Sequence, residues 1–141
     1  ASLEKRGVEV RRVARHRLAD LFLDNIPVNA HTTASDALWA GLPVLTILGD
    51  TFVGRVAASL LHAVGLPELI AESPEAYEQM AVDLATDPSR LAALKARLAA
   101  NRPTAPLFDT KRFTRHIEAA YTAMYRRHQA GLAPDHIDVP A

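Results

Sequence analysis

Three consecutive polar residues, His31, Thr32 and Thr33, stand between an apolar run that ends at Asp24 and a short helical pattern. This order predicts a helix that begins just after a buried strand. The first turn of a helix leaves backbone N–H groups without intrahelical partners, and the helix dipole adds partial positive charge. With two hydroxyls and an imidazole, such a turn could hold a diphosphate. The alternative is that Thr33 only caps the helix and that His31 lies at the surface.

Three charged residues have two interpretations each. Asp36 completes the pattern Thr33-Ala-Ser-Asp36 of a capping box, so it either satisfies a backbone donor or accepts hydrogen bonds from ribose hydroxyls. Arg55 falls in the first turn of another predicted helix, where a cation meets the positive end of the dipole. It is either a phosphate contact or a solvated side chain. Arg15, in a basic run, is either part of a solvated helix face or a further phosphate contact.

Other kinds of site have no signature in this sequence. The chain has no glycine-rich loop typical of P-loops or dinucleotide-binding turns. Its six histidines show no metal-ligand spacing such as HExxH, so we predict no metal site. Trp39 follows the apolar pattern of its short helix, and we expect it in the core.

Strands and helices alternate in the first half of the sequence, and only helices follow. Buried strands are predicted at residues 20–23, 43–48 and 66–71, and helices at 33–40 and 52–64. A charged helix is predicted over 3–17, and Ser73-Pro74, Asp87-Pro88 and Asp109-Thr110 mark the starts of three later helices. Right-handed crossovers make the sheet parallel. Three strands are few for a doubly wound domain, so we predict part of a Rossmann-like α/β lobe over residues 1–131 and a frayed tail over 132–141.

Composition excludes several classes of protein. Of the 141 residues 49% are hydrophobic, which excludes a disordered chain. The 16 Lys and Arg balance the 16 Asp and Glu, so the basic excess of a nucleic-acid binder is missing. No apolar run is long enough for a membrane span. The absence of cysteine excludes disulfides, and we expect a cytoplasmic protein.

Four segments resemble a known family. They are LADLFLD (18–24), NAHTTASDALWAGLPV (29–44), FVGRVAASLL (52–61) and PLFDTKRF (106–113). In this order they are similar to the C-terminal catalytic region of O-linked N-acetylglucosamine transferases, which include bacterial homologues with tetratricopeptide repeats. The resemblance covers roughly residues 14–128. It implies the C-terminal lobe of a GT-B glycosyltransferase, with about three parallel strands followed by helices.

The resemblance also implies roles for the polar residues. His31, Thr32 and Thr33 would hold the diphosphate of UDP, and Asp36 would meet the ribose. The family transfers N-acetylglucosamine from UDP-N-acetylglucosamine to a Ser or Thr hydroxyl without a metal or cofactor. Fixed donors and a helix dipole would then stabilise the departing diphosphate. The protein acceptor would be contacted through regions outside this chain, and no catalytic residue is assigned here.

The sequence departs from the family pattern at three positions. Arg12 stands where a His is common, Leu48 where a Pro is usual, and Gly54 where a Ser is common. Two other interpretations therefore stay open. One is a transferase that uses another sugar nucleotide, such as GDP-fucose, or a different acceptor. The other is a truncated, non-catalytic lobe. In either case the final helix is expected to leave apolar surface exposed, which favours self-association.

Overall fold

A computed structural model of the chain describes residues 13–139. The elements in chain order are β1 (Phe22–Leu23), α2 (Thr32–Ala40), β2 (Val44–Ile47), η1 (Phe52–Gly54), α3 (Val56–Ala63), η2 (Pro67–Leu69), β3 (Ile70–Ala71), α4 (Pro74–Thr86), α5 (Pro88–Asn101), η3 (Pro106–Phe108) and α6 (Thr110–Gln129). Residues 13–16 are helical, and the rest of the helix predicted over 3–17, with Arg12, lies outside the described residues. The chain divides after Ala105 into two compact units.

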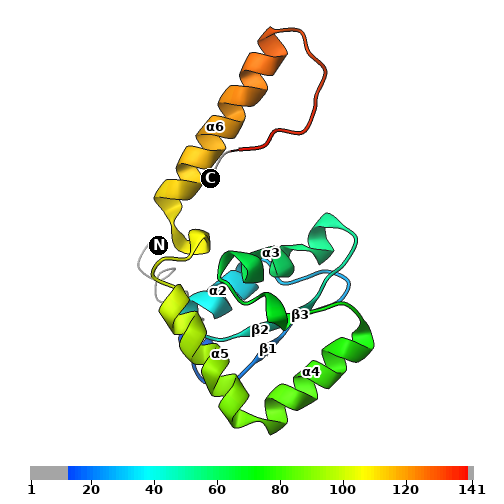
Figure 1. Cartoon of the computed structure of the whole chain (residues 1–141), viewed down its shortest axis with the longest axis vertical. Helices are drawn as coiled ribbons and strands as arrows, with labels where there is room; N and C mark the ends of the chain where they lie inside the picture. Colours follow the sequence, from blue (N-terminus) through cyan, green and yellow to red (C-terminus); the bar gives the residue numbers. More distant parts are fainter. Residues whose placement is uncertain (1–12, 140–141) are drawn as a thin grey trace, which may run out of the picture. The chain divides into compact units, whose positions relative to one another are not determined.

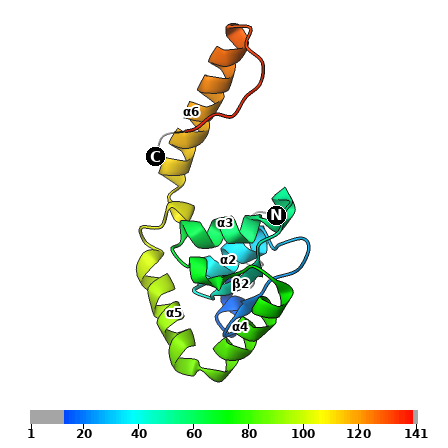
Figure 2. The same cartoon turned by 45° about the vertical axis from the view of Figure 1, so that its right-hand side comes forward.

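The first unit is built on a parallel sheet in the order β1-β2-β3, as predicted. Phe22 pairs with Val44, and Thr46 pairs with Ile70. The central strand β2 is buried along its whole length, as expected of a strand covered on both faces. Helices α2 and α3 lie on one face of the sheet and α4 on the other (Figures 1 and 2). Because β1 and β2 are parallel, their carboxyl ends lie at the same edge of the sheet.

Three predicted elements differ from the expectation. The first strand, predicted as a buried strand over 20–23, is limited to Phe22–Leu23, and Leu23 is 54% exposed because β1 is an edge strand of the sheet. The third strand is limited to Ile70–Ala71, because residues 67–69 form the short turn η2, which begins at a proline. The helix predicted over 52–64 is interrupted: η1 ends at Gly54 and α3 begins at Val56. The Gly54 carbonyl accepts a hydrogen bond from the Gly49 N–H at 2.8 Å instead of one from the next helical turn. This bond folds the start of the segment back onto the end of β2.

The end of α5 holds the C-terminal ends of α2 and α3. The Asn101 side-chain amide donates to the Val64 carbonyl at 2.9 Å, and the Arg102 guanidinium donates to the Trp39 carbonyl at 2.7 Å. The prediction that Trp39 is a core residue is wrong, because its side chain is 53% exposed. Arg102 lies over the indole ring, 5.7 Å from its centroid, so a cation–π contact takes the place of core packing.

The starts of the three long helices confirm the capping predictions. Each begins with a side-chain oxygen that accepts from the backbone N–H three residues later: Ser73 from Ala76 at 3.1 Å, Asp87 from Arg90 at 3.0 Å, and Asp109 from Arg112 at 2.9 Å. Proline follows the cap in α4 and α5, where its missing N–H costs nothing. Local sequence alone therefore sets these three boundaries.

The second unit consists of η3, α6 and the residues that follow. Residues 132–139 of the predicted tail run back beside α6 (Figure 1), and Arg127 binds the Asp135 carboxylate at 3.2 Å. No residue of α6 is buried. Of its predicted apolar row, Phe113, Tyr121 and Met124 are exposed, as expected, and Ile117 and Ala120 are half-buried. The predicted division between a lobe and a tail after residue 131 stays a prediction. None of the helices among the described residues combines the length and the apolar character that crossing a membrane requires.

Candidate functional site

The polar triplet lies at the N-terminus of α2, at the carboxyl edge of the sheet. His31 is the residue that precedes the helix, its carbonyl accepts from the Ser35 N–H at 3.1 Å, and Thr32 and Thr33 are the first two helical residues. Both threonines are exposed, and His31 is half-buried. Because they lie in the first turn of a helix, the N–H groups of these residues have no intrahelical acceptor, and the Thr32 and Thr33 hydroxyls lie close to them. We call residues 31–33 the cradle.

The capping box predicted for this helix does not form. The helix begins at Thr32, one residue earlier than expected, and His31 makes no side-chain capping bond. Asp36 is consequently the fifth helical residue, a full turn beyond the first N–H groups. The interpretation of Thr33 and Asp36 as a capping pair is therefore wrong. The interpretation of Asp36 as a ribose contact stays a prediction.

The cradle is braced by the turn that follows β2. The His31 Nε2 lies 3.4 Å from the Val53 carbonyl oxygen, and the same oxygen accepts the Asn29 N–H at 2.9 Å. The His31 ring also meets the Phe52 ring edge to face, with 6.2 Å between centroids. The Asn29 side-chain oxygen accepts from the Ala57 N–H in the first turn of α3, at 3.4 Å. The two loops at this edge thus form one assembly.

Two glycines allow this close approach. A Cβ added to Gly49 would lie 2.9 Å from the Gly54 carbonyl oxygen, and a Cβ on Gly54 would lie 3.1 Å from the Pro27 oxygen. The absence of a side chain at Gly54 therefore lets the loop before α2 contact η1. A larger residue at Gly49 would force the backbone of the turn after β2 to shift, whereas one at Gly54 would require its neighbours to move by only a few tenths of an ångström.

The two arginines predicted as phosphate contacts lie on different segments. Arg55 is the residue that precedes α3. It is exposed, makes no side-chain capping bond, and donates from Nη1 to the Gly49 carbonyl at 3.3 Å. Its guanidinium thus stands at the carboxyl end of β2. Arg15 is an exposed residue of the helical segment that leads into the amino end of β1, whereas the cradle stands at the carboxyl edge. A phosphate contact by either arginine stays a prediction.

Two residues that support the site were not predicted from the sequence. Asp24 and Asn29 are only 6% and 5% exposed, and both lie in the loop between β1 and α2. A buried polar side chain needs hydrogen-bond partners, and these two find theirs in the neighbouring loop and strand. The signal in the sequence was the position of Asp24 directly after the strand FL. Polar residues that follow a buried strand often face the edge where ligands bind.

Tyr77 on α4 connects the opposite face of the sheet to this edge. Its hydroxyl donates to the Asp24 main-chain oxygen at 3.0 Å. Partial burial raises the pKa of Tyr77, and the negative charge of Asp24 raises it further. The folded chain therefore favours the neutral phenol over the phenolate.

This shift predicts a loss of stability at alkaline pH. The pKa of Tyr77 is higher in the folded chain than in the unfolded chain. The neutral phenol therefore stabilises the folded chain fully below the ordinary tyrosine pKa of about 10, and this stabilisation declines as the pH rises through the folded-state pKa. Urea unfolding at about pH 8 and about pH 10.5 should show a larger loss of stability for the unmodified chain than for Tyr77→Phe. The exposed Tyr121, replaced in the same way, is the control. Equal losses in all three chains would contradict the assignment.

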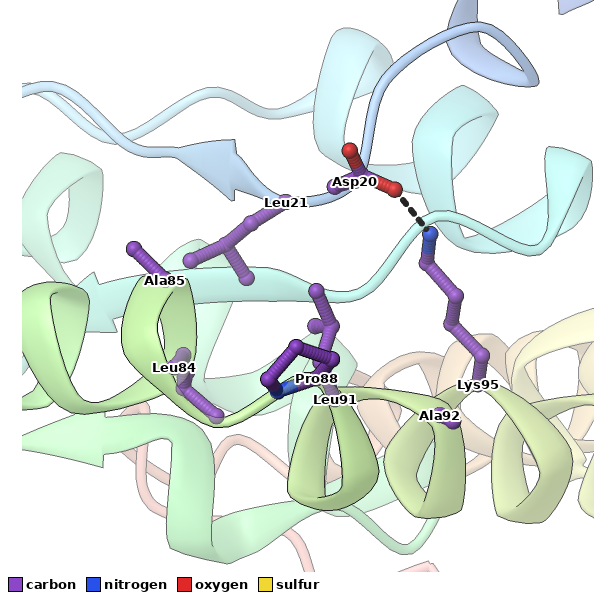
Figure 3. Close-up of a pocket in the computed structure, with 8 residues that line it drawn as sticks. All are labelled: Asp20, Leu21, Leu84, Ala85, Pro88, Leu91, Ala92 and Lys95. Carbon is purple, nitrogen blue, oxygen red and sulfur yellow. Dashed lines mark hydrogen bonds and ion pairs between the residues drawn. The ribbon is translucent and has the colours of Figure 1, made fainter.

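A separate cavity of about 490 Å³ lies at the amino end of β1 (Figure 3). Its apolar walls come from Leu21, Leu84, Ala85, Pro88, Leu91 and Ala92. At its mouth the Lys95 ammonium binds the Asp20 carboxylate at 2.7 Å. None of the predicted site residues lines it. Within residues 13–139, no three His, Asp or Glu side chains gather closely enough to hold a metal ion.

Comparisons with known proteins agree with the resemblance seen in the sequence. The sequence pattern of glycosyl transferase family 41 matches residues 6–117. The probable UDP-N-acetylglucosamine–peptide N-acetylglucosaminyltransferase SEC of Arabidopsis thaliana is 43% identical over 90% of this chain. The UDP-N-acetylglucosamine–peptide N-acetylglucosaminyltransferase of Caenorhabditis elegans is 39% identical over 89% of it. The chain spans only 13% and 11% of the lengths of these two proteins.

A solved structure shares the fold. It is a mutant of the O-GlcNAc transferase of Thermobaculum terrenum, 36% identical, with a TM-score of 0.76. The match covers 81% of this chain and 22% of that chain. The α/β lobe described above is therefore similar to part of a larger enzyme.

Proposed function

Since the chain belongs to glycosyl transferase family 41, we propose that it is the donor-binding part of a protein O-GlcNAc transferase. The enzyme would move N-acetylglucosamine from UDP-N-acetylglucosamine to a Ser or Thr hydroxyl. The observation that carries this proposal is the cradle. It presents helix N–H groups, two exposed hydroxyls and the His31 imidazole at the carboxyl edge of a parallel sheet. Open α/β sheets bind nucleotides at this edge.

In the proposed reaction, the bond between the anomeric carbon and the diphosphate oxygen breaks, and a bond to the acceptor hydroxyl oxygen forms. The acceptor loses its proton, and UDP leaves with the bonding electrons. Negative charge on the departing diphosphate increases as the bond breaks. The N–H groups of Thr32 and Thr33, with their hydroxyls, are already oriented by α2, so they can stabilise this charge without rearrangement.

Two charged side chains complete the proposed donor site. Asp36 would accept hydrogen bonds from the ribose hydroxyls, and its absence from any capping box supports this role. Arg55 would neutralise phosphate charge from the turn after β2, where its guanidinium donates to the Gly49 carbonyl. The protein acceptor would be bound mainly by regions outside these residues, because the chain spans 13% of its Arabidopsis relative.

Calorimetric titration with UDP tests the proposal. We expect the 141-residue chain to bind UDP weakly and to transfer no sugar by itself. His31→Ala should weaken binding about tenfold, as should Arg55→Ala, because each removes one hydrogen bond to an ionised group. His62→Ala, at an exposed position in the last turn of α3, is the matched control. Equal heats from the unmodified chain and His31→Ala, tighter binding of GDP than of UDP, or transfer by the chain alone would contradict the proposal.

Self-association is a further part of the proposal. On α6, Phe113, Tyr121 and Met124 are 63%, 64% and 54% exposed. A row of large apolar side chains on one helix face favours pairing with another such face. Light scattering should therefore show a mass that increases with concentration, and a constant monomer mass would contradict this part.

A further inference from the structure

The buried polar side chains of the described residues are concentrated at one place. Asp24, Asn29 and Thr46 are the three polar or charged residues that are buried within 13–139. All three lie at the carboxyl edge of the sheet or in the loop that leads to the cradle. Burying a polar group costs free energy unless its hydrogen bonds are satisfied, so this concentration indicates an organised network.

The Asp24 carboxylate is the centre of this network. Its Oδ1 accepts from the Asn25 N–H at 2.8 Å and from the Ala30 N–H at 2.6 Å, and its Oδ2 accepts from the Thr46 hydroxyl at 2.6 Å. One oxygen thus binds both ends of the loop 25–30, and the other binds β2. Hydrogen bonds to an ionised acceptor are about twice as strong as neutral ones. Ala30, the residue before His31, is therefore held at a set distance from the sheet.

The main chain of Asp24 is held as well. Its N–H donates to the Leu45 carbonyl at 3.0 Å, and its carbonyl accepts the Tyr77 hydroxyl at 3.0 Å. The residue is therefore fixed by β2 on one side and by α4 on the other. Both elements belong to the same compact unit as the cradle. Because its main chain is fixed, the Asp24 carboxylate can hold the loop 25–30 in one position.

We propose that Asp24 is a positioning residue of the donor site, which sets the location of His31 and of the first turn of α2 without touching the ligand. The inference rests on the proposed function, because it assumes that the cradle holds the diphosphate of UDP. Its physical basis is that moving the hydrogen-bond donors of an active site by about 1 Å can remove a large part of the rate enhancement. The buried carboxylate prevents such a displacement.

The test compares Asp24→Ala with Asp24→Asn in the 141-residue chain. Alanine removes the acceptors for Asn25, Ala30 and Thr46, whereas asparagine keeps one oxygen for the two N–H groups. We expect Asp24→Ala to weaken UDP binding about tenfold or more, and Asp24→Asn to restore most of the affinity. Asp20→Ala is the matched control, because that carboxylate has an 83% exposed side chain and lies at the opposite end of β1. It should leave UDP affinity unchanged.

The imidazole NMR signals of His31 provide a second measurement that general destabilisation would not move selectively. In folded Asp24→Ala they should shift, and those of His62 on α3 should stay in place. If Asp24→Ala does not fold, Thr46→Val keeps the Asp24 carboxylate and removes the bond to its Oδ2, together with the long contact of 3.4 Å between the Thr46 hydroxyl and the Ile47 carbonyl. We expect it to shift the His31 signals and weaken UDP binding.

The outcomes separate this inference from the proposed function. A folded Asp24→Ala, or Thr46→Val in its place, with unchanged UDP affinity and unchanged His31 signals overturns the positioning role. Failure of Asp24→Asn to restore affinity also overturns it. If the unmodified chain binds no UDP while the His31 signals still respond to Asp24→Ala, the proposed function fails and the link between Asp24 and the cradle is upheld.

Discussion

Replacing Gly49 by alanine should lower the free energy of unfolding by about 2 kcal/mol and abolish measurable UDP binding. The added methyl carbon would lie 2.9 Å from the Gly54 oxygen and 3.0 Å from the Gly54 Cα. Both are backbone atoms, so no flexible side chain can move aside. The turn after β2 must shift, and the Gly49–Gly54 hydrogen bond of 2.8 Å is then lost. The His31 ring nitrogen and the Asn29 N–H both contact the Val53 carbonyl oxygen in this turn. The cradle should therefore shift with the turn.

Urea unfolding and UDP titration of the same samples measure the two effects of Gly49→Ala. The neighbouring Asp50 is exposed, and Asp50→Ala leaves the backbone of the turn unobstructed, so it is the matched control. We expect that control to unfold within about 0.5 kcal/mol of the unmodified chain. A Gly49→Ala chain as stable as Asp50→Ala would show that the close approach of Gly49 and Gly54 does not constrain the turn.

Replacing Leu38 by alanine should cost about 3 kcal/mol of stability. The Leu38 side chain is fully buried, between α2 and the elements it packs on, and its removal leaves a cavity. The adjacent Trp39 is 53% exposed. Trp39→Ala should therefore cost only about 1 kcal/mol, most of it from the cation–π contact with Arg102.

Thermal and urea unfolding of the two variants make this comparison, because both truncate a large side chain on the same helix. The larger loss for Leu38→Ala is the expected result. A larger loss for Trp39→Ala would mean that the indole belongs to the core after all. UDP affinity should fall with Leu38→Ala, since α2 carries the cradle and its packing sets the direction of the first turn.

Local signals in the sequence were sufficient for most of the framework. The parallel order of the three strands, the starts of α4, α5 and α6, and the place of the polar triplet after the first strand were predicted correctly. The helix starts depend on interactions between residues close in sequence: a capping oxygen begins each helix, and in α4 and α5 a proline follows it. Such interactions operate wherever the segment stands in the fold.

Other features depend on contacts between segments distant in sequence, and only the tertiary structure decided them. Trp39 lies outside the core, where Arg102, 63 positions later, binds its carbonyl and lies over its ring. The helix predicted over 52–64 breaks because Gly54 bonds back to Gly49. The capping box gives way to a helix that begins at Thr32, where the His31 ring nitrogen lies close to the carbonyl of Val53, 22 positions later. The sequence by itself determined which residues could bind a diphosphate, whereas long-range hydrogen bonds decided how they are held.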